Sequence, residues 1–243
     1  MTFKAPISSF HLPPPPSIGV SNRLLIPMLN IVPANSDTSI YSSTLDYFSS
    51  IPWCHALLQH CPSDSTTSGR TVQRAIPFIP GSRNLPAPDC EQLFSSTLAT
   101  PEAIPHVLCF FRPDDATHAR DAQRPITQVY VLFSLGTGLS RYTGLVNGGL
   151  TAALMDEAAG ILSDLNINLG KKNHVLVNGV CITKSLKINF LRPVRATGVI
   201  VLARMWIESA QKHKVLIRGE LTGSHGERLA EAELDGVQFR PKL

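Results

Sequence analysis

Two acidic residues, Asp156 and Glu157, lie late in a segment of small and apolar residues that follows a glycine-rich turn. Residues 150–162 are good helix formers or small. Apolar side chains lie on nearly every side of this predicted helix, which is typical of a buried helix. A buried carboxylate is costly unless it is paired, hydrogen-bonded or functional. Asp156 is therefore a candidate catalytic carboxylate.

The start of the same predicted helix offers hydrogen-bond donors. Asn147 is a favourable N-cap residue. Gly148 and Gly149 carry no side chain, so a ligand can approach their backbone N–H groups closely. The first N–H groups of a helix lack internal partners and lie at the positive end of its dipole. This end of the helix can therefore stabilise an oxyanion.

The distance between these two features limits how they can work together. Gly148 and Asp156 are eight residues apart, which is ~12 Å along a helix axis. One carbonyl carbon cannot lie ~3 Å from both groups. If both serve one reaction, they come from two copies of the helix that run antiparallel in a dimer.

The sequence of residues 144–157, Gly-Leu-Val-Asn-Gly-Gly-Leu-Thr-Ala-Ala-Leu-Met-Asp-Glu, resembles the motif of hotdog-fold acyl-CoA thioesterases of the phenylacetyl-CoA thioesterase type. That motif is Gly-x-x-His-Gly-Gly, followed by Asp seven residues after the last Gly. The resemblance covers about residues 125–239, and a weaker likeness to fungal members with an N-terminal extension reaches back to about Tyr47. It implies a homodimer, or a tetramer of two such dimers, that acts on an acyl-CoA or on an acyl group bound to a carrier protein.

The resemblance also assigns catalytic roles. Gly148 matches the backbone donor to the thioester carbonyl. Asp156 matches the carboxylate that the partner subunit supplies, which either acts as the nucleophile or activates a water molecule. Thr183 falls where many members have a Ser or Thr that helps hold the water. Asn147 replaces the motif's His; it can cap the helix and donate a hydrogen bond, but it cannot titrate near neutral pH.

Four further residues are candidates for substrate binding: Gly149, Glu157, Lys184 and Arg192. Glu157 points about 100° away from Asp156 around the helix, so a structural or interfacial role, or pairing with an Arg, is the alternative. The basic residues of the predicted sheet either meet coenzyme A phosphates or form a solvated face; they are Lys184, Lys187, Arg192, Arg195 and Arg204. The two polar catalytic candidates also have structural alternatives. Asn147 could serve only as the helix cap, and Thr183 could be an ordinary strand residue.

Composition narrows the possible partners and compartments. A net charge of +4 is too small to indicate nucleic-acid binding but suits an anionic ligand. The five cysteines are scattered, without a C-x-x-C pair, which favours free thiols in a reducing compartment. No metal or cofactor motif and no membrane-spanning run occurs. We expect a cytoplasmic protein, with mitochondrial targeting as the alternative because no acid precedes Asp37.

The chain divides into three predicted parts. Residues 1–43, rich in Pro and Ser, are expected to form a flexible arm. Residues 44–124 form an extension, with a helix at 44–60 interrupted at Pro52, a linker at 62–88, a short helix at 89–98 and a strand or lid at 105–111.

Residues 125–243 form the predicted catalytic domain. A strand at 127–135 precedes the long helix, which is expected to run from Gly148 to about Leu165. Strands are expected at 174–181, 183–191, 198–208, 213–222 and 227–240, the last two joined by a hairpin at 223–226. A helix that is apolar on nearly all sides can be buried by several long antiparallel strands only if their sheet wraps around it. The sequence thus predicts an α+β hotdog fold.

Three functions follow from this site. The first is hydrolysis of an acyl thioester, in which Asp156 either attacks the thioester carbonyl or activates a water molecule beside Thr183. The second keeps the pocket but uses Asp156 as a general base in a lyase, dehydratase or cyclase of polyketide metabolism. The third is a non-catalytic acyl-binding protein.

Overall fold

The computed structural model of the protein describes residues 23–59, 74–84, 92–172, 175–176, 180–196 and 198–239. The helices are α1 (Ser39–Ser49), α2 (Pro52–Gln59) and α3 (Gly148–Asn168), with short helical turns at Pro27–Leu29, Gly81–Arg83, Leu93–Thr97 and Thr137–Leu139. The strands are β1 (Ile76–Phe78), β2 (Val107–Phe111), β3 (Gln128–Leu135), β4 (Ser140–Tyr142), β5 (Leu145–Val146), β6 (Val180–Phe190), β7 (Val199–Gln211), β8 (Lys214–Thr222) and β9 (Arg228–Phe239). In the described part of the chain, no helix is long and apolar enough to cross a membrane.

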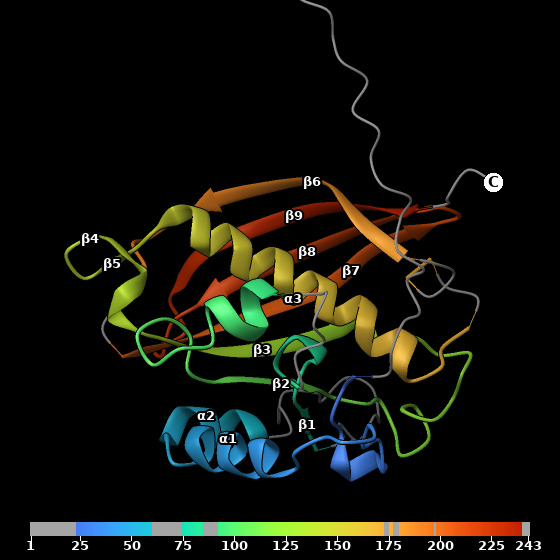
Figure 1. Ribbon diagram of the computed structural model, residues 1–243. Coiled ribbons are helices and arrows are strands. Elements are labelled where there is room, and N and C mark those ends of the chain that lie inside the picture. Colours follow the sequence, from blue (N-terminus) through green and yellow to red (C-terminus); the bar gives the residue numbers. More distant parts are fainter. Residues whose placement is uncertain are drawn as a thin grey trace, which may run out of the picture.

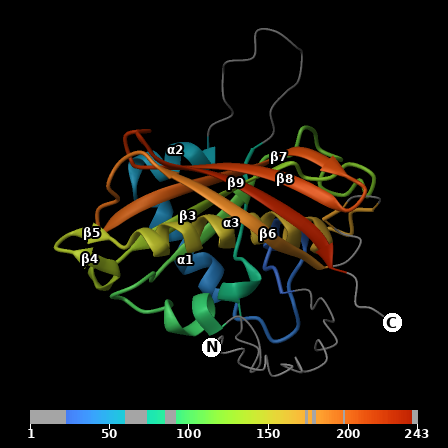
Figure 2. The same cartoon turned by 90° about the horizontal axis from the view of Figure 1, so that it is seen from above.

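The main sheet is antiparallel and has the strand order β1-β2-β3-β7-β8-β9-β6. It wraps around α3, with β3 on one side of the helix and β6 on the other (Figure 1). Figure 2 shows β6 crossing obliquely over α3. The five strands from β3 to β6 and their central helix form a hotdog fold, which confirms the predicted fold class.

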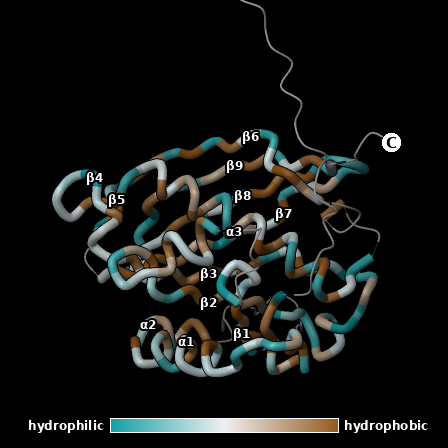
Figure 3. The backbone as a smooth tube through the Cα atoms, in the orientation of Figure 1, coloured by the Kyte–Doolittle hydropathy of each residue, from teal (hydrophilic) through white to brown (hydrophobic). Residues whose placement is uncertain are grey.

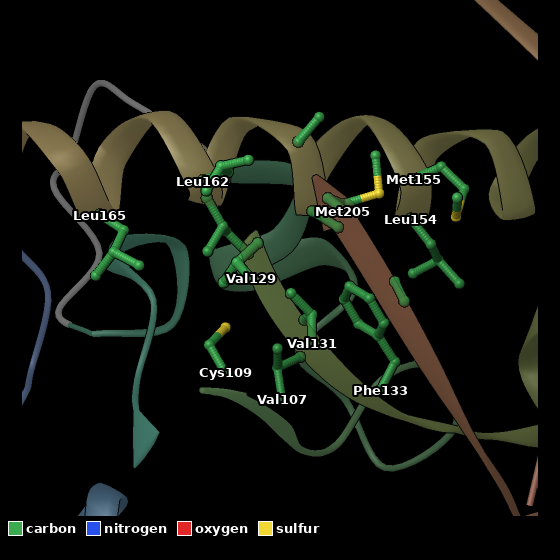
Figure 4. Packing of buried hydrophobic residues seen from close by; sticks show 14 of the residues in the cluster. Val107, Cys109, Val129, Val131, Phe133, Leu154, Met155, Leu162, Leu165 and Met205 are labelled. Atoms are coloured by element: carbon green, nitrogen blue, oxygen red, sulfur yellow. The ribbon is translucent and has the colours of Figure 1, made fainter. Parts of the chain in front are cut away.

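The alternation of side chains along the strands explains this wrapping. In β3, Val129, Val131 and Phe133 are fully buried on the face that packs against α3. Leu154 and Leu162 of α3 point toward that face (Figure 4). A helix with so many apolar residues needs cover on several sides, and a strongly curved sheet supplies it.

The N-terminal extension covers the opposite face of the same sheet. Helices α1 and α2 lie below β2 and β3 in Figure 1. Phe48 and Leu58 of these helices pack in a second apolar cluster with Leu108, Leu132 and Ile200 from three strands. Figure 3 shows hydrophobic residues where these helices meet the sheet. The predicted helix does break at Pro52, which starts α2.

Other parts of the extension differ from the prediction. Leu24, Leu25 and Ile26 are buried, so the arm expected to be flexible through residue 43 packs against the core at these three residues, and its end forms the first turn of α1 from Ser39; residues 1–22 lie outside the described residues. Residues 105–111 do not form a lid, because β2 is buried at all five positions and pairs with β3. Much of the predicted linker and part of the helix at 89–98 also lie outside the described residues.

The C-terminal strands largely follow the prediction, including the hairpin between β8 and β9. Two strands were expected at 174–181 and 183–191. The described residues contain one strand here, β6, which begins at Val180; residues 175–176 lie in a turn, and residues 174 and 177–179 lie outside the described residues. Helix α3 also continues three residues past Leu165, to Asn168. Asn166 explains this extension: its buried side chain accepts from the Ile126 N–H at 2.8 Å and donates to the Ile126 carbonyl at 2.9 Å, which ties the last helical turn to the segment before β3.

Candidate active site

Asn147 caps α3. Its backbone is extended, with φ −62° and ψ 130°, and its side-chain oxygen accepts a hydrogen bond from the Gly149 N–H at 2.8 Å. This is ordinary N-cap geometry. The cap uses the N–H of Gly149, one of the residues predicted to bind substrate, and leaves that of Gly148 as the donor at the start of the helix. Gly148 is therefore the better candidate for an oxyanion donor.

The surroundings of Gly148 leave space for a ligand. A Cβ atom placed there would lie 3.6 Å from the ring of Phe190, an ordinary van der Waals contact. Phe190, at the end of β6, has 59% of its side chain exposed. The donor thus lies beside an exposed aromatic ring.

Asp156 is hydrogen-bonded to Thr183. The Thr183 hydroxyl donates to Asp156 Oδ1 at 2.7 Å. This contact joins two of the predicted catalytic residues, which are 27 positions apart in the sequence. Helix α3 was expected to be buried, but Asp156 is exposed in the single chain. Helix α3 keeps an open stripe that contains Gly149, Asp156 and Gly160.

A β-bulge gives Thr183 its orientation. Leu186 and Ile188 of β6 pack toward the α3 core, and so does Cys181. Cys181 and Leu186 are an odd number of positions apart, so strict alternation would place them on opposite faces. The pairing with β9 shifts between Thr183 and Ser185, and this extra residue restores the match. The bulge therefore lets Thr183 face Asp156 while Leu186 stays in the core.

Glu157 faces the N-terminal extension. Its carboxylate accepts a hydrogen bond from the Ser82 hydroxyl at 2.6 Å. The neighbouring Arg83 donates to the backbone carbonyls of Phe94, at 2.8 Å, and of Ile104. Burial lowers the pKa of the Arg83 guanidinium to about 10, while the nearby Glu157 acts in the opposite direction. Glu157 thus lies in a polar contact between α3 and the extension, close to an Arg. This position fits the structural interpretation of Glu157 given above.

The basic residues that were candidates for binding coenzyme A phosphates do not lie together in one cleft. Lys184 is exposed at the bulge, and Arg192 donates to the Arg228 carbonyl at 2.6 Å. Lys187 and Arg204 lie on the face of the sheet that points away from α3, where Arg204 pairs with Glu220 at 3.3 Å. These two side chains therefore belong to a solvated outer face and not to a cleft with Asp156.

A cavity of about 240 Å³ adjoins Asp156. Its lining residues are Ser82, Leu93, Phe94, Ala153, Asp156 and Glu157. Three of them come from the extension, and the sequence contained no local signal that placed them here. The cavity shows that the candidate site is built from both parts of the chain.

Other chemically reactive residues are explained by packing. The His106 ring stacks on Tyr47, with centroids 4.0 Å apart, and burial lowers its pKa. Cys109 is fully buried in the α3 core, where burial raises the pKa of its thiol. Within the described residues, no group of three or more His, Cys, Asp or Glu side chains could hold a metal ion.

Comparison with known proteins matches the part of the chain that contains α3. Residues 143–230 match the model of the thioesterase superfamily. This part of the chain is therefore similar to that superfamily. The match begins just before the glycine-rich turn and includes Gly148, Asp156 and Thr183, and it confirms the resemblance drawn from residues 144–157.

Individual relatives cover only part of the chain. It is 27% identical over 137 residues to "Verlamelin biosynthesis protein B" from Lecanicillium sp., which is 48% of this chain and 58% of that protein's length. The solved structure of Escherichia coli PaaI, from the phenylacetic acid degradation operon, has 15% identity and a TM-score of 0.40 over 46% of this chain and 73% of PaaI. A hypothetical thioesterase from Streptococcus pneumoniae TIGR4, solved with coenzyme A, has 15% identity and a TM-score of 0.39 over 46% and 79% of the two chains.

The cap geometry leads to a prediction for Asn147. Replacing Asn147 with Ala should lower the free energy of unfolding by about 1 kcal/mol, because the Gly149 N–H loses its acceptor. Asn147→Ser should retain most of the stability, because a serine hydroxyl also caps. Chemical denaturation measures both. Equal stability of Asn147→Ala and wild type would contradict the capping role.

Proposed function

We propose that this protein hydrolyses acyl thioesters, of coenzyme A or of a carrier protein, at sites shared between two copies of the chain. The observation that carries the proposal is the hydrogen bond between Thr183 and Asp156, on a helix that starts with a glycine donor. The match of residues 143–230 to the model of the thioesterase superfamily supports the same reaction class.

The geometry of α3 supports a shared site. The helix is continuous from Gly148 to Asn168, so Gly148 and Asp156 are ~12 Å apart along its axis. A donor and a carboxylate that act on one carbonyl must both lie within about 3 Å of the reacting atoms. We therefore assign the donor to one copy and the carboxylate to the other.

Strand β6 offers the edge at which two copies would meet. It is the last strand of the sheet. Its residues Ile182 and Phe190 are exposed, and so is Leu191, which directly follows the strand. In each copy Phe190 lies beside Gly148, and Thr183 contacts Asp156. Antiparallel pairing of two β6 strands about a two-fold axis near their middle places Phe190 opposite the partner's Thr183. The same pairing brings Gly148 toward the partner's Asp156.

The open stripe of α3 fits this arrangement. It includes small residues at Gly149, Ala152, Ala153 and Gly160, all at least partly exposed. A Cβ atom at Gly160 would meet nothing within 4 Å. Small side chains let two antiparallel helices approach closely, so the partner's α3 can cover the stripe that the sheet leaves open.

The proposed reaction uses few groups. The Gly148 N–H polarises the thioester carbonyl and stabilises the oxyanion. Asp156 removes a proton from a water molecule that Thr183 helps to hold, and the water oxygen bonds to the carbonyl carbon. The carbon–sulfur bond then breaks, the thiolate takes up the proton, and a carboxylic acid and a free thiol leave. Alternatively, the Asp156 carboxylate attacks first and water hydrolyses the resulting anhydride.

A second candidate keeps the site but not the hydrolysis. Asn147 occupies the motif's His position and is engaged in capping, so it cannot act as a titrating group. The similar protein from Lecanicillium is named for a biosynthetic pathway, which fits a lyase, dehydratase or cyclase in secondary metabolism with Asp156 as general base. Hydrolysis releases a thiol and adds water to the product mass, whereas cyclisation on the thioester does neither. Acyl binding without turnover would indicate the non-catalytic alternative.

Substitutions of the carboxylate and its partner test the reaction. Asp156→Asn should lower thiol release from acyl-CoA substrates by about 10²–10⁴-fold, because the general base is lost. Thr183→Val should lower it by roughly ten- to a hundredfold, since a hydrogen bond to a charged group contributes about 1.5–3 kcal/mol. Thr183→Ser keeps the hydroxyl and serves as the control. Thiol release by Asp156→Asn at the wild-type rate would rule out this mechanism.

The backbone N–H of Gly148, the proposed oxyanion donor, can be removed without deleting any side-chain interaction, because glycine has no side chain. Gly148→Pro deletes the N–H at the first helical position, where proline is tolerated, and Asn147 already has the extended backbone that precedes proline. We expect a loss of about 10²–10³-fold in kcat with little loss of stability. Gly148→Ala keeps the N–H, has space for its methyl group and should remain active. If Gly148→Pro and Gly148→Ala turn over thioester equally fast, the Gly148 N–H is not the oxyanion donor.

A further inference from the structure

The cavity beside Asp156 has two walls of different origin. One wall is a single face of α3, where Ala153 lies one helical turn from Asp156 and Glu157. The other wall consists of Ser82, Leu93 and Phe94 from the N-terminal extension. Figure 1 shows the short green helix of residues 93–97 beside the N-terminal half of α3. The extension therefore shapes the space next to the proposed reacting carbon, which the five strands and α3 alone would leave open.

The wall that the extension supplies is held in place at several points. Arg83 donates to the backbone carbonyls of Phe94 and Ile104, so one guanidinium fixes both ends of the segment from Phe94 to Ile104, which begins directly after Leu93. Ser82 donates to Glu157 of α3 at 2.6 Å. The Phe94 side chain is only 7% exposed and packs into the α3 core. This wall is thus a constrained part of the fold.

The chemistry of the lining selects one part of a thioester. Two carboxylates, Asp156 and Glu157, would repel the phosphates of coenzyme A or of a carrier's prosthetic arm. Leu93, Phe94 and Ala153 supply apolar surface instead. A neutral acyl group fits this combination. The volume of about 240 Å³ is below the roughly 300–1,000 Å³ of sites for drug-sized ligands, which favours a short chain or a single ring.

We propose that the N-terminal extension forms the acyl subsite and that Leu93 and Phe94 set the length of acyl group that the enzyme accepts. This inference rests on the proposed thioesterase function. Leu93 has 52% of its side chain exposed, so it borders the opening of the cavity. Phe94 forms the buried part of the wall. A larger residue at 93 narrows the subsite, and a smaller one widens it.

The test compares Leu93→Trp and Leu93→Ala with wild type on straight-chain acyl-CoA thioesters from acetyl to dodecanoyl and on phenylacetyl-CoA. Leu93→Trp should lower kcat/KM by about tenfold or more for the longest acyl group that wild type accepts, and leave acetyl-CoA within about twofold. Leu93→Ala should raise kcat/KM for longer chains by a similar factor. Because Leu93 is half exposed, neither change should affect folding. Met28→Trp, at a residue with 51% exposure outside the cavity lining, is the matched control.

The outcomes separate this inference from the function on which it rests. Turnover by wild type with the same chain-length profile in both Leu93 variants would overturn the acyl subsite and leave the thioesterase function intact. Absence of turnover by wild type on the whole series would overturn the function. In that case the same acyl-CoA series is titrated onto wild type and Leu93→Trp by calorimetry. Length-dependent loss of binding in the variant supports the subsite, and equal binding or none overturns it.

Discussion

The burial of α3 is the constraint on which the rest of the structure depends. Most of its 21 residues are apolar or small, and a helix of this kind is stable in water only when several of its sides are covered. The sheet covers it by curving from β3 on one side to β6 on the other. What remains open is one stripe, and that stripe carries Asp156. The same packing that stabilises the helix thus leaves its carboxylate accessible.

The edge of the sheet and the extension complete the surroundings of this carboxylate from two directions. On one side, the bulge in β6 turns Thr183 toward Asp156 without removing Leu186 from the core. On the other side, Ser82 contacts Glu157, and Leu93 lies across the adjoining cavity. Neighbouring acids on the helix therefore face different partners: Asp156 faces β6, and Glu157 faces the extension. This division agrees with a reactive role for Asp156 and a positioning role for Glu157.

The sequence predicted the features that depend on local signals. Asn147 followed by two glycines and a run of helix formers specified both the cap and the start of α3. Alternating apolar residues specified β3 and the last three strands. The bulge could not be found in this way, because residues 183–185 are all polar and contain no alternation that reveals the extra residue. Of the strand expected at 174–181 from local propensity, residues 180–181 belong to β6 and residues 175–176 lie in a turn; the other residues lie outside the described part of the chain.

Contacts between distant parts of the chain were the least accessible to prediction. Ser82 and Glu157 are 75 positions apart, and Ser82 lies in a region whose Pro- and Ser-rich composition predicted only a linker. Likewise, the packing of Leu24 to Ile26 was not predicted, because their apolar run is interrupted at Pro27 and lies in a Pro- and Ser-rich part of the chain. Such contacts depend on how the sheet curves and on what covers its two faces. They become visible only in three dimensions.

The central claim is that each site takes its donor from one copy of the chain and its carboxylate from the other. The most direct test is a heterodimer of one Gly148→Pro subunit and one Asp156→Asn subunit, purified through two different affinity tags. If sites are shared, one of its two sites has both groups intact, and the heterodimer should recover about half of the wild-type rate of thiol release. Each parent homodimer remains inactive. A heterodimer as inactive as both parents would contradict the account, because it would show that both groups act within one subunit.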